Sequence, residues 1–263
     1  MIGGGMSHRG FMGGRKAGAP VDESIVCWLD ATEANAFYDS AVGGSIVSTN
    51  GSPIGRWQDK SGNNNHFVND TPAQRPVLET DGINSLRCAY FDGTHRWLKG
   101  LVDHPFINAA DSVVVLYVGQ SLDMTFKSRQ QGFRIRQPAG QTRLNSELAF
   151  DNTRQLHNWW RPSDNQNQSA LTSASSIPYV MQVRARWSEN SAQVVRNNAT
   201  VVNNTMNYTG QSGAENSGDM QVGGLDFNEA STLYGYIGEV IVFRNASLTL
   251  INDYQNDLIN KWI

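Results

Sequence analysis

Short apolar runs, separated by polar turns, are the dominant pattern from residue 24 onward. Residues 24–31 (SIVCWLDA) form one such run, residues 112–119 (SVVVLYVG) form a second, and residues 236–243 (YIGEVIVF) form a third. Runs of this length are typical of β-strands, and the continuous β-branched run at 112–119 is typical of a strand buried on both faces. The pattern therefore predicts a protein built mainly from strands.

Residues 179–187 (YVMQVRARW) alternate strictly between apolar and polar side chains. The apolar face comprises Met181, Val183, Ala185 and Trp187, and the polar face comprises Gln182, Arg184 and Arg186. Because side chains of a strand alternate between two faces, this pattern predicts a strand that is buried on one face only. Residues 192–202 (AQVVRNNATVV) predict a hairpin that turns at Asn197-Asn198, since asparagine tolerates the positive φ of a tight turn.

Helical periodicity is convincing only at the end of the chain. Apolar side chains recur there at three- and four-residue steps, namely Leu248, Ile251, Tyr254, Leu258 and Trp262. Thr249 is the predicted N-cap of this helix. The remaining connections are too short for βαβ crossovers, and no internal repeat is present. The sequence therefore predicts an all-β fold, an antiparallel β-sandwich with a short C-terminal helix.

The first twenty residues differ in composition from the rest. Residues 1–20 contain seven glycines and three basic side chains, Arg9, Arg15 and Lys16, and no acidic side chain. Such a segment cannot build a core, so we expect a flexible N-terminal arm over 1–20 and one folded domain over 21–263. An arm of this kind becomes ordered on a partner, and its basic side chains would neutralise acidic groups there.

Length and charge limit the remaining possibilities. The chain has 263 residues and a formal net charge of -3, which gives no global attraction to nucleic acid or to an anionic membrane. It lacks a run of about 20 apolar residues and the apolar region of a signal peptide, so neither a membrane span nor export by the usual route is expected. Cys27 and Cys88 lie far apart and are expected to be buried thiols rather than a disulfide.

Residues 54–67 (IGRWQDKSGNNNHF) are unusually dense in Gly, Asn, Asp and Ser. They predict either a tight turn or an oxygen-rich cup for calcium, with Asp59 and Asn63 as the candidate ligands. A calcium site needs several converging carboxylates and this stretch has one, so the turn is favoured and no cofactor is expected. In the turn interpretation, Asp59 and Asn63 cap backbone groups, Gly62 takes a conformation that other residues resist, and Trp57 packs inward.

Several of these stretches together resemble a known family. The motifs VCWLDA, RWQDKSGNNNHF, RPVL, YFDG and GYIGEVIVFRNASLT, followed by YQNDLINKW, are similar to the concanavalin A-like lectin/glucanase superfamily, and most closely to the laminin-G-like jelly-roll domains of bacteriophage and bacterial proteins. The resemblance covers about residues 24–99 and 234–262 and implies a jelly-roll β-sandwich. It implies little about function, because this fold supports lectins, glycosidases, receptor modules and structural units. Residues 120–175 match no part of the pattern.

Searches for catalytic groups give little. Hydrolases of the resembling superfamily carry Glu-x-Asp and a second Glu on one strand, but after Glu79-Thr80-Asp81 the positions of the third carboxylate hold Ile83 and Asn84. The five histidines show no metal-binding spacing, and the chain has no G-x-S-x-G or phosphate-binding loop motif. These absences argue against an enzyme.

Two surface segments remain as candidate contacts. Residues 127–143 carry only basic charges, from Lys127, Arg129, Arg134, Arg136 and Arg143. They predict either a contact for an acidic partner or polysaccharide, or a solvated strand whose charges prevent edge aggregation; a nucleic-acid role is disfavoured. Residues 157–168 contain adjacent tryptophans, and a strand points these to opposite faces. Whichever of Trp159 and Trp160 faces outward, next to Arg161, would stack on a sugar ring or anchor an interface, unless a loop covers it.

Three functional hypotheses follow from the residues and the resemblance. The first is a non-enzymatic virion structural or interaction protein, such as a phage decoration, head-fibre or tail-associated protein. It would assemble in the host cytoplasm, attach to other virion proteins through its arm and form a homo-oligomer in the assembly. The second is a carbohydrate-binding lectin module that attaches to a host-surface polysaccharide through Trp159 or Trp160. The third, an atypical glycoside hydrolase, is disfavoured because the carboxylate array is missing.

Overall fold

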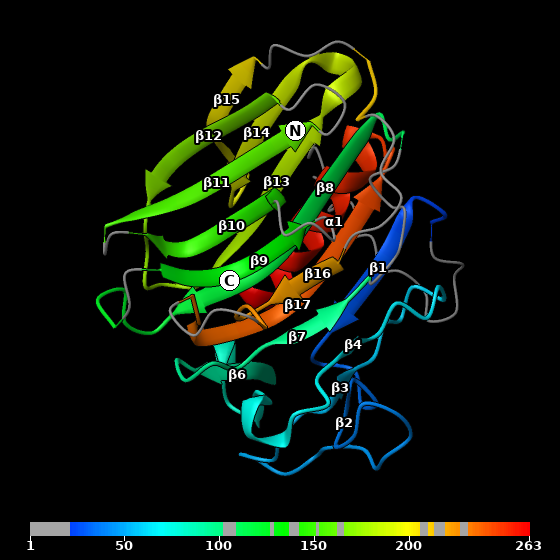
Figure 1. Cartoon of the computed structure of the whole chain (residues 1–263), viewed down its shortest axis with the longest axis vertical. Helices are drawn as coiled ribbons and strands as arrows, with labels where there is room; N and C mark the ends of the chain where they lie inside the picture. Colours follow the sequence, from blue (N-terminus) through cyan, green and yellow to red (C-terminus); the bar gives the residue numbers. More distant parts are fainter. Residues whose placement is uncertain are drawn as a thin grey trace, which may run out of the picture.

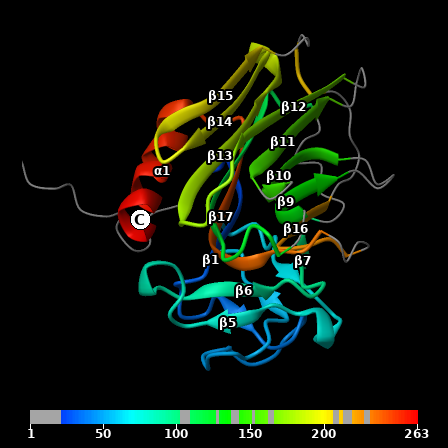
Figure 2. The same cartoon turned by 90° about the vertical axis from the view of Figure 1, so that its left-hand side faces the viewer.

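Two antiparallel sheets stack face to face, and a C-terminal helix covers the outer side of one of them (Figure 1). The structure is a computed structural model that describes residues 22–101, 109–126, 129–136, 142–150, 153–161, 166–205, 210–212, 219–226 and 231–263. In Figure 2 the helix, the first sheet (sheet A) and the second sheet (sheet B) follow one another as three layers. The predicted all-β sandwich with a short C-terminal helix is confirmed.

Sheet A contains β15 (Ala199–Thr205), β14 (Ser191–Arg196), β13 (Tyr179–Arg186), β8 (Ser112–Ser121), β17 (Tyr234–Arg244), β6 (Cys88–Asp92) and β5 (Val77–Glu79) in that spatial order, and β1 (Ile25–Asp30) also pairs with β17. Sheet B contains β12 (Gln166–Ser173), β11 (Arg154–Arg161), β10 (Thr142–Phe150), β9 (Arg129–Arg136), β16 (Asp219–Val222), β7 (Leu98–Gly100), β4 (Phe67–Val68), β3 (Arg56–Trp57) and β2 (Phe37–Tyr38) in that spatial order. The helix α1 spans Leu248–Trp262, and three short 3₁₀ turns span Pro72–Gln74, Ile83–Ser85 and Trp187–Glu189.

The central strand β8 has a core on both sides. Tyr117 points toward sheet B, where its hydroxyl lies 2.7 Å from Ser146 Oγ of β10. The alternate side chains, such as Leu116, are also fully buried, on the side of the sheet that α1 covers. This arrangement explains why residues 112–119 are continuously apolar, as the sequence predicted.

Strand β13 departs from the predicted half-buried pattern. Gln182 and Arg184, on its predicted exposed face, are 0% and 6% exposed. The cause is α1, which packs on this face of sheet A. Arg184 Nη2 donates to Asn252 Oδ1 of the helix at 2.8 Å. The strand itself was predicted correctly, but the layer that covers it was not.

The hairpin turn was predicted correctly from the sequence, but the N-cap of the helix was not. Asn197 and Asn198 have φ of 47° and 66°, which confirms the predicted turn between β14 and β15. The predicted N-cap Thr249 is wrong, because Ser247 takes the extended cap conformation and its side chain accepts a hydrogen bond from the Leu250 amide at 3.2 Å. Serine at this position satisfies a backbone donor that the helix itself leaves unpaired.

A partly buried charge cluster fastens α1 to the opening strand. Its buried members are Asp30, Glu239 and Trp262, and its half-buried members are Trp28, Lys60 and Lys261. Lys261 Nζ lies 2.8 Å from Asp30 Oδ1 and 2.7 Å from Glu239 Oε2. Glu239 also accepts hydrogen bonds from the indole nitrogens of Trp28 (2.6 Å) and Trp262 (2.9 Å). Lys60 Nζ completes the cluster at 2.7 Å from Asp30 Oδ2. Each of these contacts joins segments that are distant in sequence.

Candidate binding site

Residues 57–65 form the predicted tight turn. Asp59 accepts hydrogen bonds from the backbone amides of Trp28, Ser61 and Asn65 at 2.8–2.9 Å, and Ser61 Oγ also donates to it. Asn63 Nδ2 donates to the carbonyl of Ile25 at 2.9 Å. Trp57 is fully buried and Gly62 has a φ of +95°, so each part of the turn interpretation is confirmed.

The alternative interpretation of this turn was a calcium site. Both carboxylate oxygens of Asp59 accept hydrogen bonds from protein donors. A cation would therefore have to displace existing partners. Across the described parts of the chain, no group of three or more His, Cys, Asp and Glu side chains is arranged to hold a metal ion.

In the same residues, no helix combines the length and the apolar character needed to cross a membrane.

The two cysteines and the Glu-x-Asp segment belong to sheet A and the turn after β5, and Glu79 lies opposite Cys88 in the register of β5 and β6. Cys27 and Cys88 are buried and free, as predicted for structural thiols. Glu79 ends β5 in sheet A, and the exposed Asp81 follows it in a turn. Neither carboxylate lies on the outer face of sheet B.

Strand alternation gives the outer face of sheet B a polar composition. On β10, Leu144, Ser146 and Leu148 are buried, and Ser146 and Leu148 contact sheet A. The intervening residues Asn145 and Glu147 therefore face outward. They are nevertheless only 3% and 6% exposed. An outward face with buried polar side chains is the kind of feature that distinguishes a site from an ordinary solvated strand.

Four of these outward residues form a hydrogen-bonded series, which we call the polar ladder: Ser169, Asn158, Asn145 and Glu147. Ser169 Oγ donates to Asn158 Oδ1 at 2.5 Å. Asn158 Nδ2 donates to Asn145 Oδ1 at 2.7 Å, and Asn145 Nδ2 donates to Glu147 Oε1 at 3.3 Å. The ladder crosses the neighbouring strands β12, β11 and β10, so it fixes amide and carboxylate groups in one plane of the sheet surface.

Glu147 is the last acceptor of the polar ladder and carries an unsatisfied oxygen. Its Oε2 is buried and has no hydrogen-bond partner among the described residues. Burial raises the pKa of Glu147 above its ordinary value of 4.5, while the positive charges of Arg129 and Arg134 and the Asn145 hydrogen bond act in the opposite direction. A bare oxygen on a buried carboxylate is costly unless a donor reaches it. The carboxylate of Glu147 therefore has the capacity to accept a further hydrogen bond.

A charged flank continues the outer face beyond β9. Arg136 Nε lies 2.7 Å from Asp219 Oδ1 of β16, and its Nη2 lies 3.1 Å from Asp226 Oδ2. Lys99 Nζ of β7 lies 2.9 Å from the same Asp226 oxygen. Arg136, one of the predicted contact residues, thus has acidic partners within the protein.

The position of β9 contradicts one of the two predicted interpretations of the basic segment, residues 127–143. β9 lies between β10 and β16 in sheet B, so its charges do not protect an edge, and that interpretation is wrong. Arg134 is half-buried beside the polar ladder, where its charge lowers the pKa of Glu147. The candidate contact with an acidic partner stays a prediction for Arg134. Lys127 and the side chain of Arg143 lie outside the described residues.

Of the two adjacent tryptophans, the structure describes the side chain of Trp159. Trp159 is fully buried between the sheets, so it cannot be the stacking platform that was one of the predicted alternatives. Trp160 pairs with Asn167 in the backbone register of β11 and β12. The side chains of Trp160 and Arg161 lie outside the described residues, and their contact role stays a prediction. The predicted arm, with Arg9, Arg15 and Lys16, also lies outside them.

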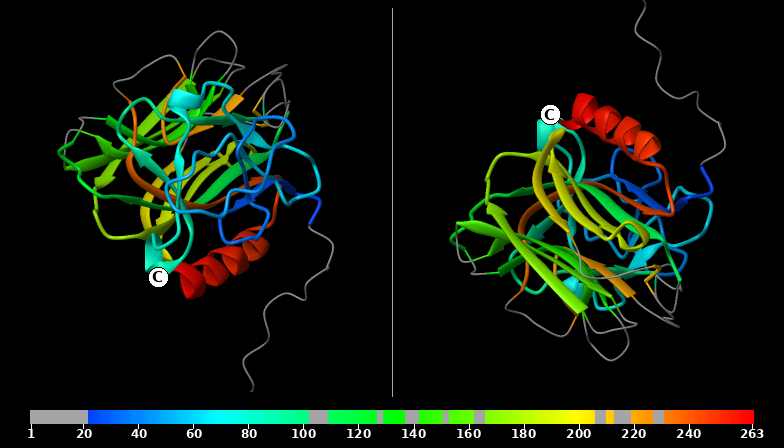
Figure 3. Two further views of the ribbon diagram at one scale, coloured as in Figure 1. Left: turned by 90° about the horizontal axis from the view of Figure 1, so that it is seen from below. Right: turned by 90° about the horizontal axis from the view of Figure 1, so that it is seen from above.

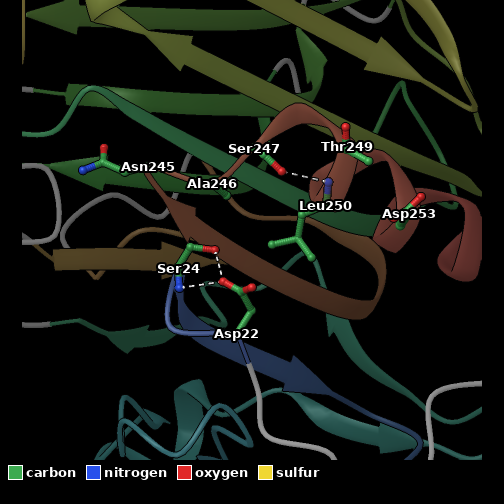
Figure 4. A pocket seen from close by; sticks show the side chains of 8 residues that line it. All are labelled: Asp22, Ser24, Asn245, Ala246, Ser247, Thr249, Leu250 and Asp253. Atoms are coloured by element: carbon green, nitrogen blue, oxygen red, sulfur yellow. Dashed lines mark hydrogen bonds between the residues drawn. The ribbon is translucent and has the colours of Figure 1, made fainter.

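A pocket with a volume of about 440 Å³ lies at the start of α1 (Figure 4). Asp22, Ser24, Ser247 and Asp253 are among its lining residues. Asp22 Oδ1 accepts hydrogen bonds from the amide and the hydroxyl of Ser24 at 2.9 and 2.6 Å. Because its polar groups serve the local turn and the helix cap, the outer face of sheet B is the stronger candidate site.

Sequence reasoning missed the polar ladder. The alternation of residues 144–148 (Leu-Asn-Ser-Glu-Leu) indicates a strand with Asn145 and Glu147 on the same face. The pairing of Asn145 with Asn158 depends on the register of β10 against β11, which places Asn145 directly opposite Asn158. Register between strands is not readable from one sequence.

Replacing Glu147 with glutamine is expected to stabilise the protein by about 1 kcal/mol at neutral pH, because it removes a buried charge that lacks a full set of donors. The folded-state pKa is raised, so the folded state binds more protons than the unfolded state above pH 4.5, and wild-type stability falls as the pH rises through the folded-state pKa. Urea unfolding at several pH values measures both effects. Glu189→Gln, at an exposed ion pair with Arg186, is the control and should change little. A destabilised Glu147→Gln variant would show that Arg129 and Arg134 already satisfy this carboxylate.

Comparison with known proteins adds information about the fold. The sequence matches no protein-family model and no curated protein sequence. Among solved structures, it is similar to the botulinum neurotoxin serotype D binding domain, with a TM-score of 0.60 and 12% identity over 90% of this chain and 51% of that chain. It is also similar to the binding domain of Paraclostridial Mosquitocidal Protein 1, with a TM-score of 0.55 and 10% identity over 88% of this chain and 52% of that chain.

A third similar structure is the binding domain of botulinum neurotoxin DC in complex with rat synaptotagmin II, with a TM-score of 0.57 and 9% identity over 90% of this chain and 52% of that chain. The chain spans about half the length of each of these structures. At such identities the likeness establishes the β-sandwich fold alone. The finer assignment to a laminin-G-like domain stays a prediction.

Proposed function

We propose that this protein is a non-catalytic binding module whose ligand is a glycan, held by hydrogen bonds on the outer face of sheet B. The observation that carries the proposal is Glu147, a buried carboxylate on an outward strand face that ends a hydrogen-bonded ladder with one oxygen unpaired. Sugar hydroxyls both donate and accept, and the polar ladder offers both kinds of group. The solved neighbours are binding domains, which agrees with a binding role.

The composition of this face favours a glycan over a protein partner. Cores of protein interfaces are rich in aromatic and aliphatic side chains. Around the polar ladder, most described side chains are amides, hydroxyls and charged groups. The apolar neighbours are the half-buried Leu156, opposite Glu147 in the register, and the exposed Leu171, opposite Leu156. Fixed polar groups of this kind orient a hydroxyl-rich ligand, since each bond has a defined direction.

The test is binding of the full chain to an array of neutral and acidic oligosaccharides, followed by titration of a positive glycan into wild type and two variants. Glu147→Gln keeps the size of the side chain and removes its charge, and it is expected to weaken binding about tenfold, the usual scale for a hydrogen bond to a charged group. Glu189→Gln, in the short turn that follows β13 of sheet A, should bind like wild type. The Glu147→Gln variant would then be more stable and bind less well than wild type, which is a common trade-off at binding sites.

Two outcomes would overturn the proposal. One is glycan binding that Glu147→Gln leaves unchanged, which would place the ligand elsewhere. The other is a negative array together with binding of the full chain to purified virus particles. That result would support the virion structural protein with its N-terminal arm, and a loss of particle binding on neutralising Arg9, Arg15 and Lys16 together would identify the arm as the attachment.

A further inference from the structure

A second pocket lies on the side of sheet A that faces away from sheet B, where α1 meets the hairpin of β14 and β15. Figure 3 shows the helix lying along these strands. The pocket has a volume of about 330 Å³, at the lower end of the range for small-ligand sites. It is lined by Arg184, Val195, Asn198, Thr200, Asn252, Gln255 and Asn256. Most of its lining is polar, and none of these residues is acidic.

Arg184 is the one charged residue of the pocket, and it is 6% exposed. Its guanidinium donates to three side-chain amide oxygens: Gln182 Oε1 (2.5 Å), Gln193 Oε1 (3.1 Å) and Asn252 Oδ1 (2.8 Å). Among the described residues, no carboxylate forms an ion pair with it. Two of its five N–H groups are therefore left without a protein acceptor in the described part of the chain.

The electrostatic surroundings of Arg184 are unfavourable to its charge. Burial, and then the positive charge of Arg186, lower the pKa of Arg184 to about 10. Arg186 itself has an ion-pair partner in Glu189. Buried charges in proteins are normally paired, because removing an ion from water is expensive. An unpaired guanidinium that lines a pocket therefore needs an explanation beyond holding strands together.

Gln255 provides a second, independent observation. It lines the same pocket, is 1% exposed, and its Nε2 has no hydrogen-bond partner among the described residues. Its Oε1 accepts from Gln182 Nε2. A buried donor without an acceptor and a buried cation without an anion thus line one cavity, and a single ligand with negatively charged oxygens would satisfy both.

We propose that this pocket binds an oxyanion, either a free inorganic anion such as phosphate or the carboxylate of an acidic sugar, with Arg184 as its counter-ion and Gln255 as a further donor. Asn198 and Asn256, whose side chains hydrogen-bond at 2.8 Å, and Thr200 supply the remaining polar lining. The site is separate from the outer face of sheet B, because sheet A lies between them (Figure 2).

The first experiment measures the Tm of the full chain in sodium phosphate and in sodium chloride at equal ionic strength. Wild type is expected to gain about 2–4 °C in phosphate, since a ligand that binds only the folded state raises its stability. Arg184→Met should lose this gain. Arg186→Met, two residues along the same strand, is the matched control and should keep it. Sodium glucuronate against glucose forms the second arm, and stabilisation by glucuronate alone would assign the pocket to an acidic sugar.

Two further measurements test the proposal even if the Arg184→Met variant does not fold. On wild type, NMR titration with phosphate should shift the Arg184 Nε–H and Gln255 side-chain amide signals and saturate. Asn252→Asp supplies a carboxylate in place of the amide that accepts from Arg184 Nη2. It should raise the Tm without added anion and abolish the response to phosphate.

In an Arg184→Met background, Asn252→Asp should give no such gain, which separates the ion pair from the helix dipole. The proposal is overturned if neither anion stabilises or shifts the wild type, or if Arg184→Met and Asn252→Asp both respond like wild type.

Discussion

Replacing Lys261 with methionine is expected to lower the free energy of unfolding by about 3–5 kcal/mol, the usual cost of removing one partner from a buried ion pair. Lys261 bridges Asp30 and Glu239, which are 4% and 1% exposed. Without the ammonium group, Lys60 would be the remaining cation next to two buried carboxylates. Burial and the charge of Asp30 already raise the pKa of Glu239, so this carboxylate depends on Lys261 for its charge.

Lys99→Met is a matched control for Lys261→Met. Both lysines have 29% exposed side chains and ion-pair lengths below 3 Å, but Lys99 faces Asp226, which is 17% exposed. Its replacement should cost about 0–1 kcal/mol. Urea unfolding of wild type and both variants measures the difference. Adding Glu239→Gln to Lys261→Met should recover part of the loss, because it removes one of the stranded charges. Equal, small losses for the two lysine variants would show that the cluster is not a buried ion network.

The motifs on which the family resemblance rests meet in this cluster. The opening strand supplies Trp28 and Asp30, the turn supplies Lys60, the strand β17 supplies Glu239 and the closing helix supplies Lys261. These residues fall within the motifs on which the resemblance rests. The motifs therefore encode how the ends of the chain are fastened to the sandwich. They carry no information about the ligand, which agrees with a resemblance that predicts fold better than function.

Local chemistry was enough to predict the strands and the hairpin. The β-branched run of β8 and the Asn197-Asn198 turn depend on neighbours in sequence, so they are readable from it. The burial of Arg184 depends on a helix that packs from more than sixty residues away in the chain, so the polar alternation of β13 was misread as exposure. The site was hidden for the same reason, because Asn145 and Asn158 meet only through strand register.

His157 is expected to make the protein acid-sensitive below about pH 6.5. It is fully buried between the sheets. Thr172 Oγ1 lies 3.0 Å from its Nε2 and donates to Gln155 Oε1 (3.3 Å), so Nε2 of His157 donates to the threonine oxygen. Nδ1 then carries no proton, and it has no hydrogen-bond partner among the described residues. Protonation would place a charge and an unpaired N–H in the core.

Burial, with a smaller contribution from the charge of Arg196, lowers the pKa of His157 from 6.5 to about 3. Between these two values the unfolded state binds more protons than the folded state, so stability is lost as the pH falls from 6.5 toward 3. The slope from this group alone is about 1.4 kcal/mol per pH unit. His157→Gln retains a donor for Thr172 and cannot be protonated, so it should remove this slope even where it lowers stability at neutral pH.

The measurement is the free energy of urea unfolding between about pH 7.5 and pH 4.5 for wild type, His157→Gln and His66→Gln, because subtraction cancels the carboxylates that titrate in all three. His66 is partly exposed, and its pKa is lowered by burial and Arg56 but raised by Asp59. The net direction is downward, but the shift is smaller than that of His157, so His66→Gln should remove a smaller part of the slope than His157→Gln. Converging wild-type and His157→Gln curves at low pH would confirm a buried neutral imidazole. Parallel curves would mean that the folded sandwich admits the proton, and the tightly packed core around His157 would then have to open to water without unfolding.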